Sequence, residues 1–331
     1  MADSLLRYMF RRLPQVARRD KKIARLKRRL SALENDLATR TEWSRDVRRP
    51  SYQARIHAER RLRRLSAELG MPSRSVIRRG KFHVYDLARS HGIEPPVEFG
   101  RWDEPNDIPW SELPDLVVIK SARGAHGRGV FPLRRSDHEW DIITADETMS
   151  SEQITKSLTA SVDDGQAGPP FVAEEFLDED GSGTRLPTDV KVYAFYGDVP
   201  MVVLRRPGRL GEHPLVTPFR VLDAHGDDVT DVDTGSIVDP SMPVPAKLDE
   251  IVAAASRLSV AIRAPFSRLD FYGIGDRVVF GEVTPRPGGS AWHGEAVDRR
   301  LGEAWERAQI RLDRDLASGM PHEPEFGPYG A

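Results

Sequence analysis

The sequence contains no cysteine and no long uninterrupted hydrophobic run. Without thiols, disulfide bonds, thiolate nucleophiles and zinc sites built on sulfur are excluded, so any metal ion must be held by oxygen or imidazole ligands. The short apolar run from Leu5 to Phe10 lacks the length and the cleavage site of a secretory signal. No later stretch reaches the roughly 20 apolar residues of a transmembrane helix. These absences predict a cytoplasmic protein.

Charge is distributed unevenly along the 331 residues. Residues 1–80 contain 23 Lys and Arg against 8 Asp and Glu, whereas residues 81–331 contain 26 against 43. This asymmetry predicts a basic segment appended to an acidic globular body. The expected organisation is a basic helical or coiled-coil segment at residues 1–75, a small helical segment at residues 76–115 and a catalytic domain at residues 116–331.

The basic segment carries an apolar stripe whose members are spaced alternately three and four apart, as in a coiled coil. These members are Ile23, Leu26, Leu30, Leu33 and Leu37. The helix can pack on the chain's own body, associate with a second copy or another protein through residues 15–70, or contact an anionic membrane surface at the inner face of the membrane. A nucleic-acid partner is not expected, because the basic residues are not part of a recognised nucleic-acid-binding motif and no aromatic residues are spaced among them.

From Lys81 onward the pattern alternates between strands and helices. Buried strands are predicted at residues 116–120 and 130–133, with a glycine-rich turn between them. Because no helix follows the glycines, the usual Rossmann and P-loop contexts are excluded. A glycine-rich hairpin can instead fold over phosphate groups, since glycine lets backbone N–H groups approach closely. An ordinary turn is the alternative.

A predicted hairpin in the last quarter of the sequence is the most informative stretch. Arg268 and Asp270 lie two apart on its first strand, and Glu282 and Thr284 lie two apart on the strand that returns. Two carboxylates that converge beside a basic residue suit a magnesium nucleotide, because hard cations take oxygen ligands. The alternative is that both carboxylates merely pair with neighbouring arginines on a sheet surface.

Six sequence elements occur in an order that resembles ATP-grasp enzymes. In chain order they are Lys81, Lys120 with its glycine loop, Glu174-Glu175-Phe176-Leu177, Asp189-Val190-Lys191, Arg268-Leu269-Asp270 and Glu282-Val283-Thr284-Pro285. Within that superfamily the chain looks most like the ligases associated with teichuronopeptide and other surface-polysaccharide biosynthesis. The resemblance implies an α+β ATP-grasp fold, in which two α+β subdomains clasp a nucleotide, preceded by the basic helical segment.

The resemblance also implies ATP and Mg²⁺ as cofactors and a set of nucleotide-binding residues. This set is Lys81, Lys120, Gly124, Gly127, Gly129, Glu174, Glu175, Phe176, Leu177 and Asp189. The two lysines would neutralise the phosphates, and the glycines would cover them. The strand that begins at Glu174 would meet the adenine, largely through backbone groups, while Asp189 would bind the ribose hydroxyls. Because the basic helical segment lies outside this resemblance, we expect that residues 1–70 can be removed without loss of nucleotide binding.

The remaining matches form a metal-binding and catalytic set. Asp270 and Glu282 would bind magnesium ions, with Thr284 where many ATP-grasp enzymes have Asn. The third ligand therefore departs from the general pattern, because a threonine hydroxyl is a weaker ligand. Arg268 would stabilise charge on an acyl phosphate, and Lys191 belongs with it in the catalytic set.

The implied reaction is ADP-forming ligation through an acyl phosphate, which needs no covalent nucleophile. The expected substrates are a small-molecule, glycan or peptide carboxylate and an amine, such as an amino acid joined to a surface polysaccharide or peptide precursor. His126 and His293 are candidates by location for the residue that takes the amine proton. Two alternatives remain open: a kinase acting on a hydroxyl of a sugar-like substrate, and a non-catalytic nucleotide-binding scaffold.

Overall fold

The computed structural model of the chain describes residues 22–23, 26–27, 29–31, 33, 49–71, 81–123, 129–143, 145, 147–208, 212, 216–229, 238–287 and 294–329. The chain divides into two compact units, Met1–Pro50 and Ser51–Ala331. None of the helices in the described part has the length and apolarity that a membrane span requires. Several predicted features lie outside the described residues or side chains: Leu37, the side chain of Lys81, Gly124, His126, Gly127 and His293.

In the first unit, the described residues between Lys22 and Leu33 are helical. Ile23, Leu26, Leu30 and Leu33 of the predicted apolar stripe are 43–59% exposed. The spacing therefore predicts the helix correctly at these positions, whereas pairing of the stripe stays a prediction.

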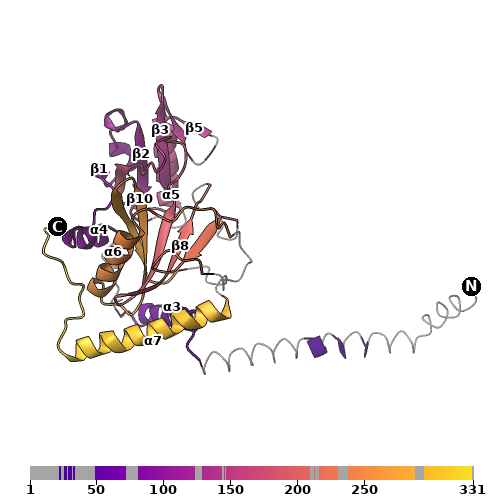
Figure 1. Cartoon of the computed structure of the whole chain (residues 1–331). Coiled ribbons are helices and arrows are strands. Elements are labelled where there is room, and N and C mark those ends of the chain that lie inside the picture. Colours follow the sequence, from indigo (N-terminus) through magenta and orange to yellow (C-terminus); the bar gives the residue numbers. More distant parts are fainter. Residues whose placement is uncertain are drawn as a thin grey trace, which may run out of the picture. The chain divides into compact units, whose positions relative to one another are not determined.

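The first sheet of the larger unit has six strands in the order β1-β6-β2-β3-β4-β5, all antiparallel (Figure 1). They are β1 (Glu98–Trp102), β2 (Leu116–Ser121), β3 (Val130–Ser136), β4 (Glu139–Ile142), β5 (Glu147–Met149) and β6 (Phe171–Glu175). Two short 3-10 turns, η2 (Pro105–Asp107) and η3 (Trp110–Glu112), precede β2. Helix α5 (Ser151–Asp163) covers one face, where Ile154 and Leu158 share a core with Ile119. Because side chains alternate along a strand, Val118 and Lys120 lie on the opposite face.

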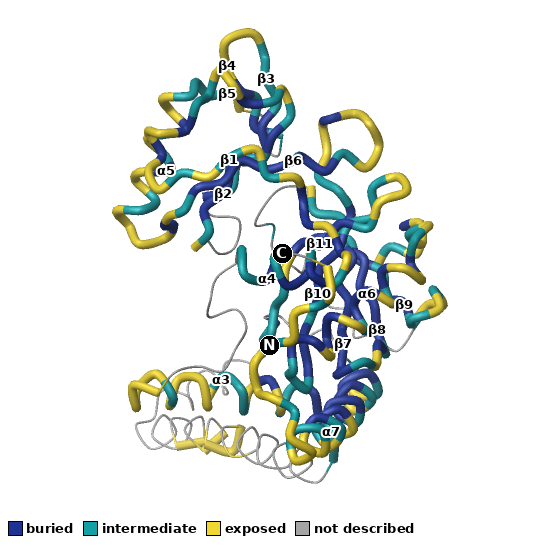
Figure 2. Tube along the Cα trace, turned by 90° about the vertical axis from the view of Figure 1, so that its left-hand side faces the viewer, coloured by how far each residue is buried: buried dark blue, intermediate teal, exposed yellow. Residues whose placement is uncertain are grey.

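The second sheet has five strands in the order β11-β10-β7-β8-β9, also antiparallel. They are β7 (Asp189–Phe195), β8 (Asp198–Arg205), β9 (Phe219–Leu222), β10 (Ser267–Ile274) and β11 (Arg277–Thr284). Helices α4 (Lys81–Ser90) and α6 (Leu248–Ala261) cover one face, in a core that includes Ile251 and Leu269. Helices α3 (Tyr52–Glu68) and α7 (Glu295–Ala317) cover part of the other face, in a core that includes Tyr52, Phe195 and Trp305 (Figure 2).

Helix α3 belongs to the compact unit, although its residues fall within the basic segment predicted at residues 1–75. Tyr52 and Ile56 are fully buried. The ring centroid of Tyr52 lies 5.2 Å from that of Phe266 and 5.9 Å from that of Trp305. The compact unit therefore begins before α3 rather than after it, because two apolar side chains anchor an otherwise charged and exposed helix.

Contacts of α4 and β11 join the two sheets. The ring of Tyr85 lies 6.2 Å from that of Phe280, and its hydroxyl accepts a hydrogen bond from Lys120 Nζ at 3.0 Å. At the start of β11, Arg277 donates two hydrogen bonds of 2.6 and 3.0 Å to Glu175 at the end of β6. Lys120 on one sheet and the predicted metal-binding hairpin on the other are therefore parts of one connected region.

Candidate active site

A set of polar side chains, which we call the charged cluster, gathers on the five-stranded sheet. Its members are Asp189, Lys191, Arg268, Asp270, Glu282 and Thr284. The strand register places Asp270 opposite both Lys191 on β7 and Glu282 on β11, while Arg268 lies opposite Thr284. All of these side chains point to one face, because paired residues share a side and alternate residues repeat it. This is the face that α3 and α7 cover further along β7, where Tyr193 and Phe195 belong to the core that these helices share.

Asp270 lies at the centre of the charged cluster. Arg268 holds both oxygens of its carboxylate with two hydrogen bonds of 2.7 Å. Lys191 Nζ donates to the same carboxylate at 2.7 Å and lies 3.0 Å from the carboxylate of Asp189. Asp270 is 1% exposed, so these charges are paired away from water.

The protonation states of the central pair follow from this arrangement. Burial alone would raise the pKa of Asp270, but the positive charges of Arg268 and Lys191 outweigh it and lower that pKa to about 2. Burial would likewise lower the pKa of Lys191, yet Asp189 and Asp270 raise it above its ordinary value. At neutral pH Asp270 is therefore an anion and Lys191 a cation, and both supply fixed charge rather than exchange protons.

Glu282 and Thr284 place further oxygen atoms, which can bind a metal ion, beside Asp270. Thr284 Oγ1 accepts a hydrogen bond from Arg268 at 2.9 Å and donates one to Glu282 at 3.1 Å. Among the residues that the structure describes, no three His, Asp or Glu side chains come together as a ready metal site. Mg²⁺ usually takes one or two protein carboxylates and completes its shell with phosphates and water. Glu282 is half exposed and can offer such a carboxylate directly. Both oxygens of Asp270 already accept hydrogen bonds from Arg268 and Lys191, so Asp270 would have to share its carboxylate between these cations and a magnesium ion that arrives with a nucleotide.

Lys120 is the predicted phosphate-binding residue of the six-stranded sheet, and it is only 3% exposed. Its ammonium forms an ion pair with Glu174 of β6, in addition to the hydrogen bond to Tyr85. A phosphate group that binds here would replace Glu174 or Tyr85 as the partner of the Lys120 ammonium.

The other predicted adenine-binding residues follow Glu174. The carboxylate of Glu175 accepts both hydrogen bonds from Arg277, and these bonds lower the pKa of Glu175. The side chain of Glu175 therefore takes part in the contact between the two sheets. Phe176 and Leu177 are buried. Gly129 closes the glycine-rich turn with a φ of +67°, a backbone conformation that favours glycine.

Sequence reasoning missed two tyrosines beside the charged cluster. The hydroxyl of Tyr272 hydrogen-bonds to Asp189, and the negative charge of that carboxylate raises the pKa of Tyr272. Burial raises the pKa of Tyr193 to about 12. Each tyrosine lies two residues after a predicted member, Tyr272 after Asp270 and Tyr193 after Lys191. The period-two pattern that indicated the charged residues could therefore have indicated these tyrosines.

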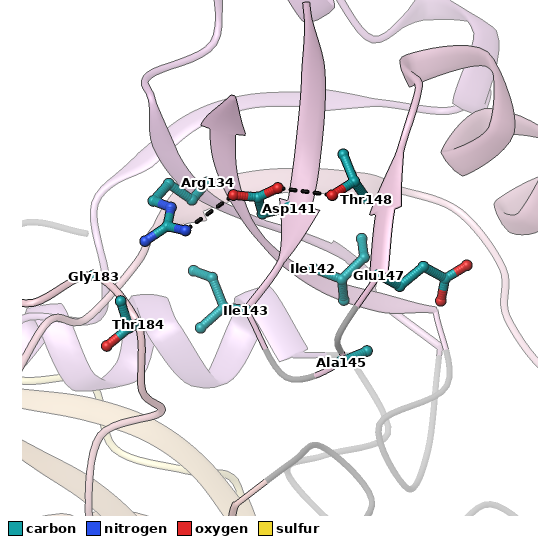
Figure 3. A pocket seen from close by; sticks show the side chains of 9 residues that line it. All are labelled: Arg134, Asp141, Ile142, Ile143, Ala145, Glu147, Thr148, Gly183 and Thr184. Atoms are coloured by element: carbon teal, nitrogen blue, oxygen red, sulfur yellow. Dashed lines mark hydrogen bonds and ion pairs between the residues drawn. The ribbon is translucent and has the colours of Figure 1, made fainter. Parts of the chain in front are cut away.

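A hollow of about 250 Å³ opens at the far end of the six-stranded sheet (Figure 3). Part of its polar lining is already paired, because Arg134 and Thr148 each donate a 2.9 Å hydrogen bond to Asp141. It lies at the Leu116 end of β2, and a strand of this length places Lys120 roughly 13 Å away. The hollow is therefore separate from the chemistry of the charged cluster and Lys120.

A family model described as TupA-like ATPgrasp matches residues 77–306. The chain belongs to this family. The match runs from just before α4 into α7 and includes Lys120 and the whole charged cluster, while α3 lies outside it. The ATP-grasp fold predicted from the sequence is thereby confirmed, and the predicted cofactors ATP and Mg²⁺ go with membership of this family.

Solved ATP-grasp ligases are similar to this chain at low identity. The ligase PsnB complexed with minimal precursor is 14% identical, with a TM-score of 0.38, over 70% of this chain and 60% of PsnB. The D-alanine–D-alanine ligase from Bacillus anthracis complexed with ATP is 14% identical, with a TM-score of 0.45, over 76% of this chain and 75% of the ligase. The chain thus spans about three-fifths of the length of the PsnB chain in that complex. No curated protein sequence matches the chain.

Replacing Lys120 by Ala should weaken the binding of a non-hydrolysable ATP analogue by about 10–150-fold, since a hydrogen bond to a charged group contributes about 1.5–3 kcal/mol. Calorimetry measures this dissociation constant. Lys156→Ala, an exposed position on α5, is the control that removes the same charge.

Lys120→Ala also leaves the buried Glu174 without its cation, so a loss of affinity can come from a disturbed fold. The double variant Lys120→Met/Glu174→Gln avoids an uncompensated charge and should lose the same affinity. An unchanged dissociation constant in the double variant would rule out the assignment of Lys120 to the phosphates.

Proposed function

We propose that this chain is an ADP-forming ligase that joins a carboxylate to an amine through an acyl phosphate. The observation that carries the proposal is buried Asp270, which is held between Arg268 and Lys191 and lies beside Glu282. This arrangement offers cations for phosphate and carboxylate groups and oxygen ligands for magnesium. Fixed charges of both signs in one place suit phosphoryl transfer, which needs alignment and electrostatic stabilisation.

The reaction has two steps. In the first, a carboxylate oxygen of the substrate bonds to the terminal phosphorus of ATP, and the bond from that phosphorus to the ADP oxygen breaks. In the second, the amine nitrogen bonds to the acyl carbon, phosphate leaves with the bonding electrons, and the amine proton passes to solvent. Mg²⁺ held by Asp270 and Glu282 would offset charge on the phosphates.

In this proposal, Arg268 and Lys191 stabilise the transferring group. The guanidinium of Arg268 spans Asp270 and Thr284, so its planar fork is held in one orientation. Lys191 is held in the same way by its two carboxylates. Cations that are fixed in advance need no reorganisation when charge moves onto the phosphoryl oxygens.

We assign the substrates to the precursors of a cell-surface polysaccharide or peptide, to which an amino acid is added. The assignment is supported by the resemblance of the sequence elements to ligases of surface-polysaccharide biosynthesis. The proposed place of action is the cytoplasm, with the basic residues 15–70 as the segment that contacts a protein partner or the inner face of the membrane.

Trapping with hydroxylamine separates ligation from the alternatives. With ATP, Mg²⁺ and a panel of candidate acids, the ligase should release ADP and yield a hydroxamate. A kinase acting on a hydroxyl yields ADP without a hydroxamate, and a non-catalytic scaffold yields neither. Arg268→Gln should lower hydroxamate formation by roughly a hundredfold or more, as expected for a group that stabilises the transition state.

Arg257→Gln is the control for that variant, because Arg257 is exposed on α6 and lies outside the charged cluster. Thermal unfolding of both variants shows whether the fold survives. Release of ADP from every productive acid without any hydroxamate would contradict the acyl phosphate.

A further inference from the structure

Three arginines next to the charged cluster form no ion pair with a carboxylate among the residues that the structure describes. They are Arg60 and Arg63 of α3 and Arg286, which follows β11, and we call them the arginine triad. Six other arginines of the unit form ion pairs of 2.6–3.0 Å with Asp or Glu: Arg55, Arg101, Arg134, Arg220, Arg263 and Arg277. Single arginines such as Arg61 and Arg257 also have no such pair among the described residues, so what distinguishes the triad is that its three members gather in one place.

Helix α3 and the segment after β11 hold the triad together. Arg60 donates a hydrogen bond of 2.7 Å to the backbone carbonyl of Pro287, which fixes α3 to that segment. Arg60 and Arg63 are three residues apart and so lie on one side of the helix. Both act on Arg286 as like charges, and Glu59 is the carboxylate that offsets them in part.

The triad lies beside the charged cluster rather than beside the six-stranded sheet. Arg286 is two residues beyond Thr284, whereas the contact of β11 with the six-stranded sheet is at Arg277, the other end of the strand. The hydroxyl of Tyr52 is within electrostatic range of both Arg268 and Arg60. The positive charges thus continue from the charged cluster to α3.

Gathered guanidinium groups repel one another, so the arrangement costs stability unless an anion offsets the charge. The planar fork of arginine matches a carboxylate or a phosphate. We propose that the arginine triad binds an anionic group of the substrate, remote from the carboxylate that receives the phosphoryl group. This inference rests on the proposed ligase function, and it makes the substrate an oligoanion with at least one further carboxylate or phosphate. Because α3 lies outside the matched residues 77–306, two of the three arginines, Arg60 and Arg63, lie beyond the family match, whereas Arg286 lies within it.

The test measures the binding of defined oligoanions to the full chain by calorimetry. Hexaglutamate and trigalacturonate represent carboxylates, and tripolyphosphate represents phosphates. Saturating Mg²⁺ and a non-hydrolysable ATP analogue are present, so that the probes do not compete for the nucleotide site. We expect at least one probe to bind, with a dissociation constant that rises at least tenfold in Arg63→Gln/Arg286→Gln, and the class of that probe identifies the anionic group.

The matched control is Arg61→Gln/Arg307→Gln, which removes the same number of charges from exposed positions on α3 and α7. Its dissociation constant for the probe should change less than twofold. Binding by the basic residues 1–50 is common to both variants, so the difference between them measures the triad.

Equal weakening in the two double variants would overturn the inference, and so would a wild-type chain that binds none of the probes. Thermal unfolding of each variant shows whether its fold is retained. A wild-type chain that fails to bind the ATP analogue would contradict the proposed function instead, because the triad is judged by the probes alone.

Discussion

Removing residues 1–70 should destabilise the body by roughly 5–10 kcal/mol, enough to unfold it, whereas removing residues 1–50 should leave it folded. The longer deletion strips Tyr52 and Ile56 from the core that they share with Trp305. The sequence pattern predicted that nucleotide binding survives the longer deletion. The burial of these two side chains changes that expectation, because the cut at residue 70 passes through the folded unit.

Chemical denaturation of the full chain and both truncations measures this difference. The point variant Tyr52→Ala should cost about 3–5 kcal/mol in the free energy of unfolding. Leu65→Ala, on the same helix but 49% exposed, should cost less than about 0.5 kcal/mol. If both truncations were as stable as the full chain, α3 would not be part of the body.

Replacing Glu282 by Gln should lower ATP turnover by about 10²–10³-fold or more, the range seen when one stabilising group of a charged transition state is removed. The side chain of Glu282 is 50% exposed and lies 3.3 Å from Arg268, so its loss should leave the fold intact. ADP release at saturating Mg²⁺ measures turnover. Asp276→Asn, in the exposed turn of the same hairpin, should behave like the wild type.

A substitution of Asp270 is harder to interpret than one of Glu282, because it also lowers the stability of the fold. Removing Asp270 leaves Arg268 and Lys191 buried without their shared anion, which costs about 3–5 kcal/mol. Near-normal turnover in Glu282→Gln would remove magnesium ligation by this hairpin from the mechanism, whatever happens to Asp270 variants.

The sequence was most informative where the spacing of residues alone decides the geometry. Arg268 and Asp270 share a face because they lie two apart on a strand, and a tight turn brings Glu282 opposite to Asp270. The same geometry holds on β7, where Lys191 lies opposite Asp270 and shares its face. These positions depend on local backbone geometry, which a short stretch of sequence determines.

Contacts between distant segments were beyond such reasoning. The ion pair of Lys120 with Glu174 depends on the register of β2 against β6, which are separated by the whole of β3 to α5. The contact of Tyr85 with Lys120 depends on where α4 docks. In α3, the arginines dominate the pattern and conceal the two residues that anchor the helix, Tyr52 and Ile56.

The burial of Asp270 also determines how the protein responds to ionic strength. Mobile ions screen exposed charges over a Debye length of about 8–10 Å in ordinary buffers, and they act much less on pairs that water does not reach. Asp270 with Arg268 and Lys191 belongs to the second class, whereas Arg63 on the exposed side of α3 belongs to the first. The centre of the charged cluster therefore keeps its internal pairs in concentrated salt, while the attraction of the arginine triad for an anion fades.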